Sequence, residues 1–232
     1  KTAVVASCHQ SVEEQFITRK IADHLNSSVY IARHLSKGDG LLLSEDRTPN
    51  TRGALLNGLT DNLPTEDLSS LAEKIDSEKV DTLLVCREDL TRVGLSEAQL
   101  EKVKLVLLDT QTSATASHAD VQLPALTVFE KNGTFVNLNF RLQKFSQAVP
   151  GPAGLLPDTL ILSKILSTLT GESFPDNPAT IWKSLSQSNS NFKGIDFSSI
   201  PTDGIQLEKS AFDHIDFPEK QSLKYSPAAI TG

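Results

Sequence analysis

Apolar runs and amphipathic stretches alternate along the first half of the chain. Short, almost continuously apolar runs are typical of strands buried on both faces, and they occupy residues 3–7, 28–32, 81–86 and 104–109. Apolar residues at helical spacing predict helices at 11–25, 51–59, 66–78 and 96–103. One more apolar run, at 40–44, is a further candidate strand. This alternation predicts an α/β fold with a mostly parallel sheet flanked by helices.

The first helix carries the clearest local signal. Ser11 is followed three residues later by Glu14, the spacing of a capping box, in which the two residues satisfy each other's backbone N–H groups. Phe16, Ile17 and Ile21 then form an apolar face at helical spacing. We therefore expect the helix to begin at Ser11 and to pack on the sheet.

The second half predicts a β-hairpin followed by helices and an irregular tail. A strand at 121–124 is expected to end at Pro124, and Gly133 to form a turn by adopting a positive φ. Residues 136–143 alternate apolar and polar, which predicts one half-buried strand with a polar face. After a rigid connection at 149–157, helices are expected from Asp158 to Gly171 and over 177–185, capped by Asp158 and Asn177.

These elements suggest two structural units. Residues 1–172 would form the α/β domain, and residues 173–232 a helix plus an extended tail that packs on it or on a partner. The tail from about residue 190 is rich in Ser, Pro and Asp with scattered Ile and Phe, so little regular structure is expected there.

Composition narrows the classes of partner. The chain has 22 Lys and Arg against 29 Asp and Glu, a net charge of −7, and no basic run, so a nucleic-acid partner is not expected. No apolar run approaches the roughly 20 residues of a membrane span. The chain contains no methionine, and we expect it to be part of a longer protein.

Metal-binding patterns are missing from the sequence. Cys8 and Cys86 stand at the ends of strand-like runs without CxxC spacing, and the preferred interpretation is that they are buried, structural thiols. The histidines are scattered, and none has metal-ligand spacing. Phosphate-binding glycine motifs are also absent. The sequence therefore predicts no metal site and no classical nucleotide loop.

Two polar segments leave alternatives open. In 44–53, Arg47 and Arg52 can pair with the neighbouring acids, the preferred interpretation, or hold an anion. Glu130, Asn137 and Arg141 can satisfy turn amides, or they can form a polar face for a ligand or a neighbouring subunit. Periodicity does not choose between these.

One long motif resembles a known family. "ADVQLPALTVFEKNGTFVNLNFRLQ" is similar to the ADVVLP…E..GTF.N.EGR.Q signature of the molybdopterin oxidoreductases. "PNTRGALLNGL" resembles a motif of the respiratory branch, the G (75 kDa) subunit of bacterial NADH-quinone oxidoreductase, or complex I. The structural motif residues that carry the resemblance are Asn50, Arg52, Gly53, Pro124, Glu130, Gly133, Thr134, Asn137, Arg141 and Gln143.

The resemblance implies a scaffold in the peripheral arm of that respiratory complex. The chain would be a cofactor-free, non-catalytic module from the C-terminal part of the subunit, supporting electron transfer from NADH to quinone. Iron–sulfur clusters would belong to the N-terminal part of the full protein, since two cysteines cannot hold a four-cysteine cluster. Its partners would be those N-terminal domains and the other subunits of the complex. The expected location is the cytoplasmic side of the membrane, without a span.

The alternative is a molybdopterin-guanine-dinucleotide enzyme similar to formate dehydrogenase. The segment would then line the cofactor, with contacts from Asp109, Thr110, His118, Asp120 and Arg141. Phe140 stands where the signature has glycine, and glycine often marks a close approach to a ligand. This departure favours the cofactor-free interpretation, unless Phe140 only continues the apolar face of a strand.

Overall fold

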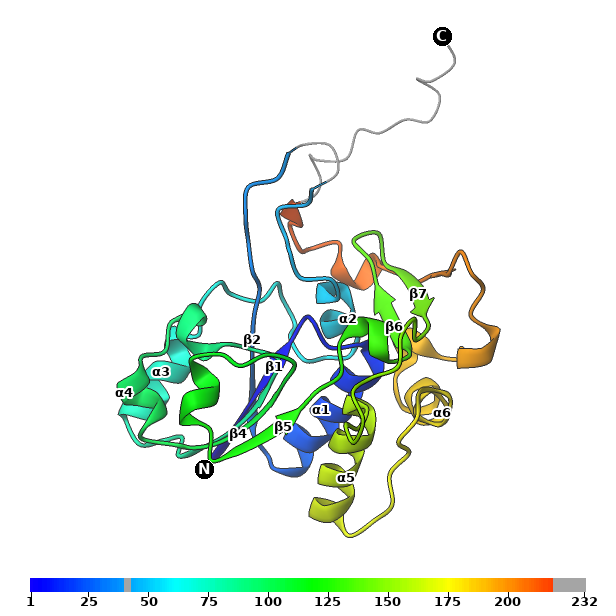
Figure 1. Ribbon diagram of the computed structural model, residues 1–232. Coiled ribbons are helices and arrows are strands. Elements are labelled where there is room, and N and C mark those ends of the chain that lie inside the picture. The colour runs from blue at the N-terminus through cyan, green and yellow to red at the C-terminus, as the bar shows by residue number, and fades with distance from the viewer. Residues whose placement is uncertain (40–42, 219–232) are drawn as a thin grey trace.

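The computed structural model describes residues 1–39 and 43–218, and its centre is a parallel sheet (Figure 1). Five strands lie in the order β2-β1-β3-β4-β5, and every neighbouring pair is parallel. Their bounds are β1 Thr2–Ser7, β2 Ser28–Ala32, β3 Thr82–Cys86, β4 Lys104–Asp109 and β5 Val121–Pro124. The expected α/β class and the end of β5 at Pro124 are confirmed.

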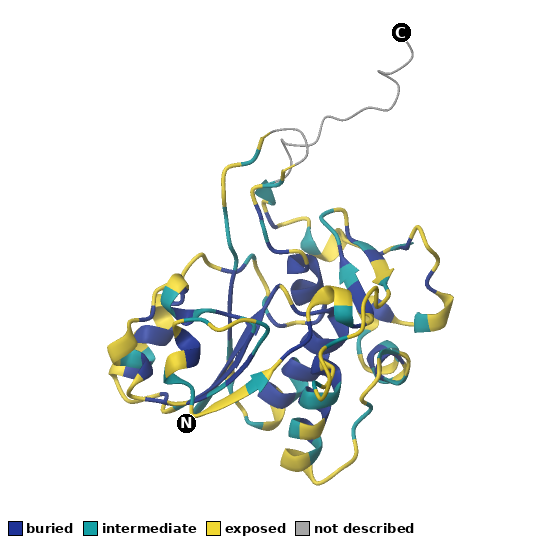
Figure 2. Cartoon of the chain, in the orientation of Figure 1, coloured by how far each residue is buried: buried dark blue, intermediate teal, exposed yellow. Residues whose placement is uncertain are grey.

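Helices cover both faces of this sheet, which is why its strands are apolar on both sides (Figures 1 and 2). Val4 and Leu84 pack in one cluster with α1, α5 and α6, while Val5 and Val85 pack in a second cluster with α3. The helix bounds are α1 Val12–His24, α2 Thr51–Leu56, α3 Ser69–Asp76, α4 Glu97–Leu100, α5 Asp158–Thr170 and α6 Pro178–Ser188.

The expected capping box begins α1. The Glu14 N–H donates to Ser11 Oγ at 3.3 Å, and the Ser11 N–H donates to Glu14 Oε2 at 3.0 Å. Both residues are fully buried, so this helix start lies inside the protein and not on its surface.

A second, antiparallel sheet in the order β6-β7-β8 lies beside the N-terminal end of α1 (Figure 1). Its strands are β6 Gly133–Val136, β7 Arg141–Phe145 and β8 Ile205–Gln206. The tail thus adds a strand to the hairpin, and several of its apolar side chains are buried: Phe192, Ile200, Leu207 and Ile215.

The single strand expected over residues 136–143 is wrong, because residues 137–140 form the hairpin turn. Asn137 Oδ1 accepts from the N–H groups of Asn139 (2.9 Å) and Arg141 (3.0 Å). Phe140 closes the turn at φ +58°, a left-handed conformation that favours glycine. The side chain of Phe140 is buried and stacks on Phe212, at 5.4 Å between ring centroids. The turn geometry alone therefore accounts for a glycine at this place in the signature.

The turn expected at Gly133 is also wrong. Gly133 begins β6 and is not among the residues with positive φ. A Cβ there would come within 2.8 Å of the Phe145 ring and 3.1 Å of Ser11 Cβ. This glycine thus permits the close packing of the hairpin on the start of α1.

Asn50, in the PNTRGA motif, joins three segments of the chain. Its amide nitrogen donates to Gln10 O (2.8 Å) and Gln15 Oε1 (3.1 Å), while its Oδ1 accepts from the Val136 N–H (2.8 Å). A Cβ on Gly53 would overlap the Asn50 side chain. Asn50 and Gly53 are therefore structural residues that fix α2 against α1 and β6.

Other sequence expectations differ in detail. The candidate strand at 40–44 falls mostly on residues 40–42, outside the described residues, and residues 43 and 44 are not in a strand. The expected pairing of Arg52 is confirmed, with Arg52 Nη1 3.8 Å from Asp46 Oδ2. Cys8 and Cys86 are buried free thiols, and burial raises the pKa of each to about 12.

Gly53→Ala tests the packing around Asn50. We expect the substitution to lower the free energy of unfolding by about 1–3 kcal/mol, the range for overpacking a buried site, because the new methyl group collides with the Asn50 side chain. Urea denaturation measures the loss.

The double variant Asn50→Ala/Gly53→Ala provides the control. Since the overlap disappears without the Asn50 side chain, the two losses should not add, and the double variant should unfold close to Asn50→Ala alone. Additive losses would show that Gly53 matters for a reason other than Asn50.

Candidate functional site

Polar side chains gather where β1, β2 and β3 end. The strand order reverses between β1 and β3, and ligands of open parallel sheets bind at such switch points, outside the carboxyl ends of the strands. His9 follows β1, His34 follows β2 and Glu88 follows β3. His34 Nε2 lies 3.1 Å from Glu88 Oε2, and the rings of His9 and His34 are 5.8 Å apart. The topology thus brings together three residues from distant parts of the sequence.

Burial perturbs the carboxylates of this edge. Glu88 is only 3% exposed, and burial raises its pKa, against the opposite effect of His34. Partial burial also raises the pKa of Asp109, at the end of β4, against the effects of the Thr110 N–H and Arg87. Desolvation and repulsion by His34 and Arg87 lower the pKa of His9. Groups with perturbed pKa values at a sheet edge are candidates for ligand contacts.

Arg33 adds a cation at the same edge, between the last residue of β2 and His34. Its Nε and Nη1 atoms are buried and have no hydrogen-bond partner among the described residues. Buried N–H groups without partners are unfavourable, so these two nitrogens have unused capacity to bind an anion.

A buried network of four charges lies next to this edge. Lys131 Nζ is 2.5 Å from Glu14 Oε1 and 3.3 Å from Asp158 Oδ2. Arg87 Nε donates to the same Asp158 oxygen at 2.8 Å, and its Nη2 also bonds Asp158 and the Leu126 carbonyl. Although burial opposes it, the charges of Glu14 and Asp158 raise the pKa of Arg87. The network joins α1, β3, α5 and the segment after β5.

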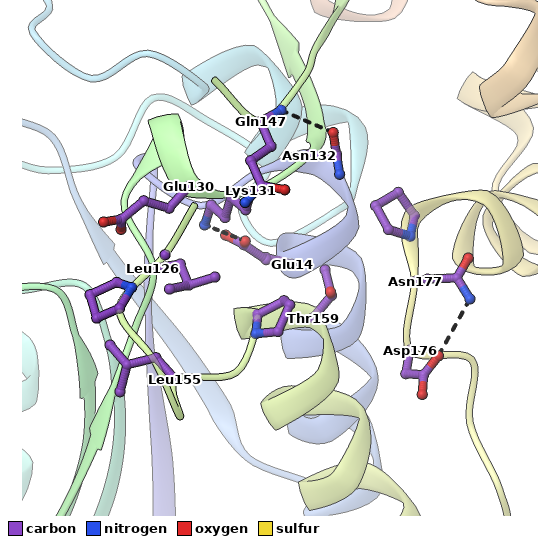
Figure 3. A pocket seen from close by; sticks show the side chains of 14 residues that line it. Glu14, Leu126, Glu130, Lys131, Asn132, Gln147, Leu155, Thr159, Asp176 and Asn177 are labelled. Carbon is purple, nitrogen blue, oxygen red and sulfur yellow. Dashed lines mark hydrogen bonds and ion pairs between the residues drawn. The ribbon is translucent and has the colours of Figure 1, made fainter. Parts of the chain in front are cut away.

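A pocket of about 350 Å³ opens above this network (Figure 3). Glu14 and Lys131 lie at its floor, and its walls come from the loop before α5 and the start of α6. The other lining residues are Leu126, Glu130, Asn132, Gln147, Gly151, Pro152, Leu155, Pro157, Thr159, Asp176, Asn177 and Pro178.

The five cofactor contacts predicted from the resemblance do not share one place. Asp109 and Thr110 lie at the carboxyl edge of the sheet, at and after the end of β4. His118 and Asp120 precede β5, and Asp120 accepts from the Leu105 N–H (2.8 Å) at the opposite edge. Arg141 lies in the second sheet and donates to the Asp203 carbonyl at 3.1 Å. Of the five, only Asp109 and Thr110 stand at the carboxyl edge of the sheet, where His9, His34 and Glu88 also lie. We call this edge, at the ends of β1 to β4, the switch-point edge.

The polar residues of the hairpin are largely occupied within the protein. Glu130 Oε2 accepts from the Thr127 N–H (2.8 Å) and hydroxyl (2.9 Å). The Thr134 hydroxyl donates to Glu13 Oε1 at 3.0 Å. Asn137 caps the hairpin turn, and its amide nitrogen donates to Gln143 at 3.3 Å. These contacts are the turn and packing roles that the sequence left open.

Sequence reasoning missed His9, His34 and Glu88 as a group, along with the four-charge network. The available signal was position: His9, His34 and Glu88 each stand two residues after the end of a predicted strand. No group of three or more His, Cys, Asp or Glu in residues 1–39 and 43–218 has the arrangement of a metal site. In the same residues, no helix is long and apolar enough to cross a bilayer.

Comparison with known proteins assigns the family. Residues 7–168 match the molybdopterin oxidoreductase family, and this range includes β2, β3, β4 and β5 of the main sheet, α1, the hairpin and most of α5. The chain belongs to the molybdopterin oxidoreductase family. The switch-point edge and the buried network described above both lie within the matched range.

Curated relatives of this family member are named as formate dehydrogenases. An F420-dependent formate dehydrogenase 2 subunit alpha of Methanococcus maripaludis is 34% identical over 103 residues, 44% of this chain and 15% of that protein. A putative formate dehydrogenase of Bacillus subtilis is 28% identical over 130 residues, 54% and 13% of the two chains. One of Staphylococcus haemolyticus is 27% identical over 142 residues, 59% and 14%. The matches thus span about one seventh of each relative.

Lys131→Met tests the buried network. Removing the ammonium leaves Glu14 and Asp158 with less compensation, and we expect a loss of about 3–5 kcal/mol of unfolding free energy at neutral pH, typical of breaking a buried ion pair. Urea denaturation measures the loss.

Lys102→Met is the matched control. Lys102 Nζ lies 2.6 Å from Asp76, but both side chains are about half exposed, at 52% and 49%. Removing this pair should cost less than about 1 kcal/mol. Equal losses in the two variants would contradict a special role for the buried network.

Glu88→Gln tests the electrostatics of the switch-point edge. Since the pKa of Glu88 is raised, the folded state binds a proton more tightly than the unfolded chain. Its contribution to stability is therefore lost as pH rises from the usual glutamate value of about 4.3 through the raised pKa. The variant should lose this part of the decline, which begins above the usual glutamate pKa of about 4.3, and urea denaturation at several pH values measures it. Glu97→Gln, at an exposed carboxylate, should retain the wild-type profile.

Proposed function

We propose that this chain is the segment of a formate dehydrogenase-like enzyme that holds the nucleotide end of a molybdopterin cofactor. The observation that carries the proposal is the chemistry of the switch-point edge. Asp109 offers a partly exposed carboxylate, Arg33 has buried donors without partners, and His9 and His34 stand beside one another. Family membership and the names of the relatives support the same interpretation.

The residues fit a guanine nucleotide in charge and hydrogen-bonding capacity. Asp109 Oδ1 accepts from the Thr110 N–H at 2.7 Å, and its other oxygen can accept from the N–H donors of a guanine base. Arg33 supplies positive charge for a diphosphate. Glu88 would hold the His34 ring in place through its 3.1 Å contact. The bound cofactor would supply the redox centre, and this segment would bind and orient one end of it.

A second candidate is the cofactor-free scaffold of an NADH-quinone oxidoreductase G subunit. The observation that favours it is Arg87, which takes a left-handed conformation (φ +56°) directly after β3. Its side chain is only 9% exposed and is paired with Glu14 and Asp158. The Arg87 side chain therefore occupies space beside the switch point that a ligand would otherwise take. Under this candidate the neighbouring subunits of the respiratory complex would be its partners, and the edge would bind no nucleotide.

Binding of GDP discriminates between the two candidates. GDP presents the guanine base and diphosphate without the pterin, and isothermal titration calorimetry measures its affinity for the chain. We expect binding that is at least tenfold weaker in Asp109→Asn, because the amide cannot accept from both guanine donors; a hydrogen bond to a charged group is worth about 1.5–3 kcal/mol.

Asp120→Asn is the matched control, since Asp120 also bonds a backbone N–H but at the opposite edge of the sheet. Its GDP affinity should stay within twofold of wild type, and thermal unfolding should show that both variants fold. Absence of GDP binding to the wild-type chain, or equal weakening in both variants, would overturn the proposal. Undetectable GDP binding together with NADH-oxidising partners in a membrane preparation would establish the scaffold.

A further inference from the structure

The pocket over the buried network has an excess of negative charge. Its lining includes three carboxylates, those of Glu14, Glu130 and Asp176, and one ammonium, that of Lys131, which leaves a formal excess of two negative charges. Lys131 is 4% exposed and already engaged by Glu14 and Asp158, so it is not available to a ligand anion. The pocket therefore favours a cationic occupant.

The two helix ends beside the pocket do not reverse this sign. A helix N-terminus carries roughly half a positive charge, and α5 and α6 both begin at the pocket wall. The first turn of α5 contains Asp158, whose negative charge offsets the positive end of the helix dipole. Asp176 directly precedes Asn177, the N-cap of α6, and does the same there. Even with the helix contributions, the rim remains negative.

Several oxygen atoms of the pocket-lining residues have unused capacity to accept a hydrogen bond from a ligand. Among the described residues, Glu130 Oε1 and Asp176 Oδ2 accept no hydrogen bond, because Thr127 donates to Glu130 Oε2 and Asn177 donates to Asp176 Oδ1. Gln147 donates through its nitrogen to the Val149 carbonyl, which leaves its Oε1 available. The hydroxyl of Thr159, a residue only 4% exposed, lines the pocket and has no partner among the described residues. Because Glu130 and Asp176 lie on opposite walls of the pocket (Figure 3), a guanidinium group, with five N–H donors, can bond only one of these carboxylates at a time.

An exposed apolar patch adjoins the pocket mouth. Phe129 is 65% exposed and Val149 is 49% exposed, the former directly preceding Glu130 in sequence. They lie side by side, because the Phe129 carbonyl accepts from the N–H groups of Ala148 (2.8 Å) and Val149 (3.1 Å). Val128, at 36%, extends the patch. An exposed phenylalanine beside a polar pocket is typical of an interaction surface with an apolar anchor and a charged contact.

We propose that this surface docks a partner polypeptide through an arginine side chain that enters the pocket while apolar neighbours of that arginine cover Phe129 and Val149. The aliphatic stem of the arginine would pack on Leu126 and Leu155, and its guanidinium group would reach Glu130 on the same wall (Figure 3). Asp176 stands on the opposite wall and would add negative charge to the pocket without contacting the guanidinium group. The pocket volume of about 350 Å³ is within the range of small-ligand sites. This inference does not rest on the proposed function, since the pocket is separate from Asp109 and the histidines.

Capped tripeptides test the proposal directly. Acetyl-Leu-Arg-Leu-amide is titrated into the chain, and binding is followed by the backbone amide NMR shifts of Asn132, Gln147 and Thr159. We expect saturable binding that weakens with added salt, because the contacts at the rim are solvent-screened charges. Acetyl-Leu-Gln-Leu-amide, which lacks the charge, should bind at least tenfold more weakly.

Matched variants locate the site. Glu130→Gln/Asp176→Asn should weaken the arginine peptide at least tenfold, while both side chains keep an oxygen for their internal bonds. Asp61→Asn/Glu66→Gln removes the same charge from exposed positions between α2 and α3 and should bind within twofold of wild type. Phe129→Ser should weaken binding several-fold without shifting the thermal unfolding midpoint, because the ring is exposed.

Four outcomes would overturn the proposal. Equal binding of the arginine and glutamine peptides would show that the pocket does not recognise the positive charge. No binding at millimolar peptide would show that the pocket is not a docking site for such a peptide. Agmatine binding as tightly as the peptide would make the pocket a small-molecule site. A dimer in sedimentation experiments that Phe129→Ser dissociates would make a second copy of the chain the occupant.

Discussion

The first turn of α1 is the constraint on which the rest of the structure depends. It buries two adjacent glutamates, Glu13 and Glu14, both fully inaccessible to solvent. Glu13 Oε1 accepts from Trp182 Nε1 at 2.7 Å and from the Thr134 hydroxyl, and Glu14 binds Lys131. Burial raises the pKa of Glu13, although its hydrogen bonds oppose this. Because a buried carboxylate is strongly unfavourable without partners, these contacts fix where α6, β6 and the segment after β5 must lie.

This arrangement explains how one compact parallel sheet carries a second, smaller sheet. The hairpin β6–β7 packs on α1 through Gly133 and Thr134, and Asn50 ties α2 to the same place by bonding the Val136 N–H. The tail then adds β8 to β7. Since charged and amide groups make these connections with fixed geometry, they specify position more sharply than apolar contact alone would. The pocket at the start of α5 and α6 is a consequence, because those helix starts converge on Glu14 and Asp158.

The sequence predicted much of the fold, since the decisive signals were local. The apolar runs identified β1, β2, β3 and β4, and the Ser11–Glu14 spacing identified the start of α1. The hairpin was predicted less well. Alternation over 136–143 indicated one strand, but Asn137 bonds two backbone N–H groups and Phe140 adopts a positive φ, so the chain turns there. A side chain that caps its own backbone outweighed the period-two pattern.

From the sequence alone we predicted the fold class, the strands of the main sheet and the caps of α1 and α6, and we recognised a resemblance to the molybdopterin oxidoreductases. Which polar residues meet became known from the three-dimensional structure. His9, His34 and Glu88 are far apart in sequence, as are Glu14, Lys131 and Asp158, and no spacing rule relates them. The physical reason is that local patterns follow from backbone periodicity and capping, whereas contacts between distant side chains depend on strand order and on which helix covers which face.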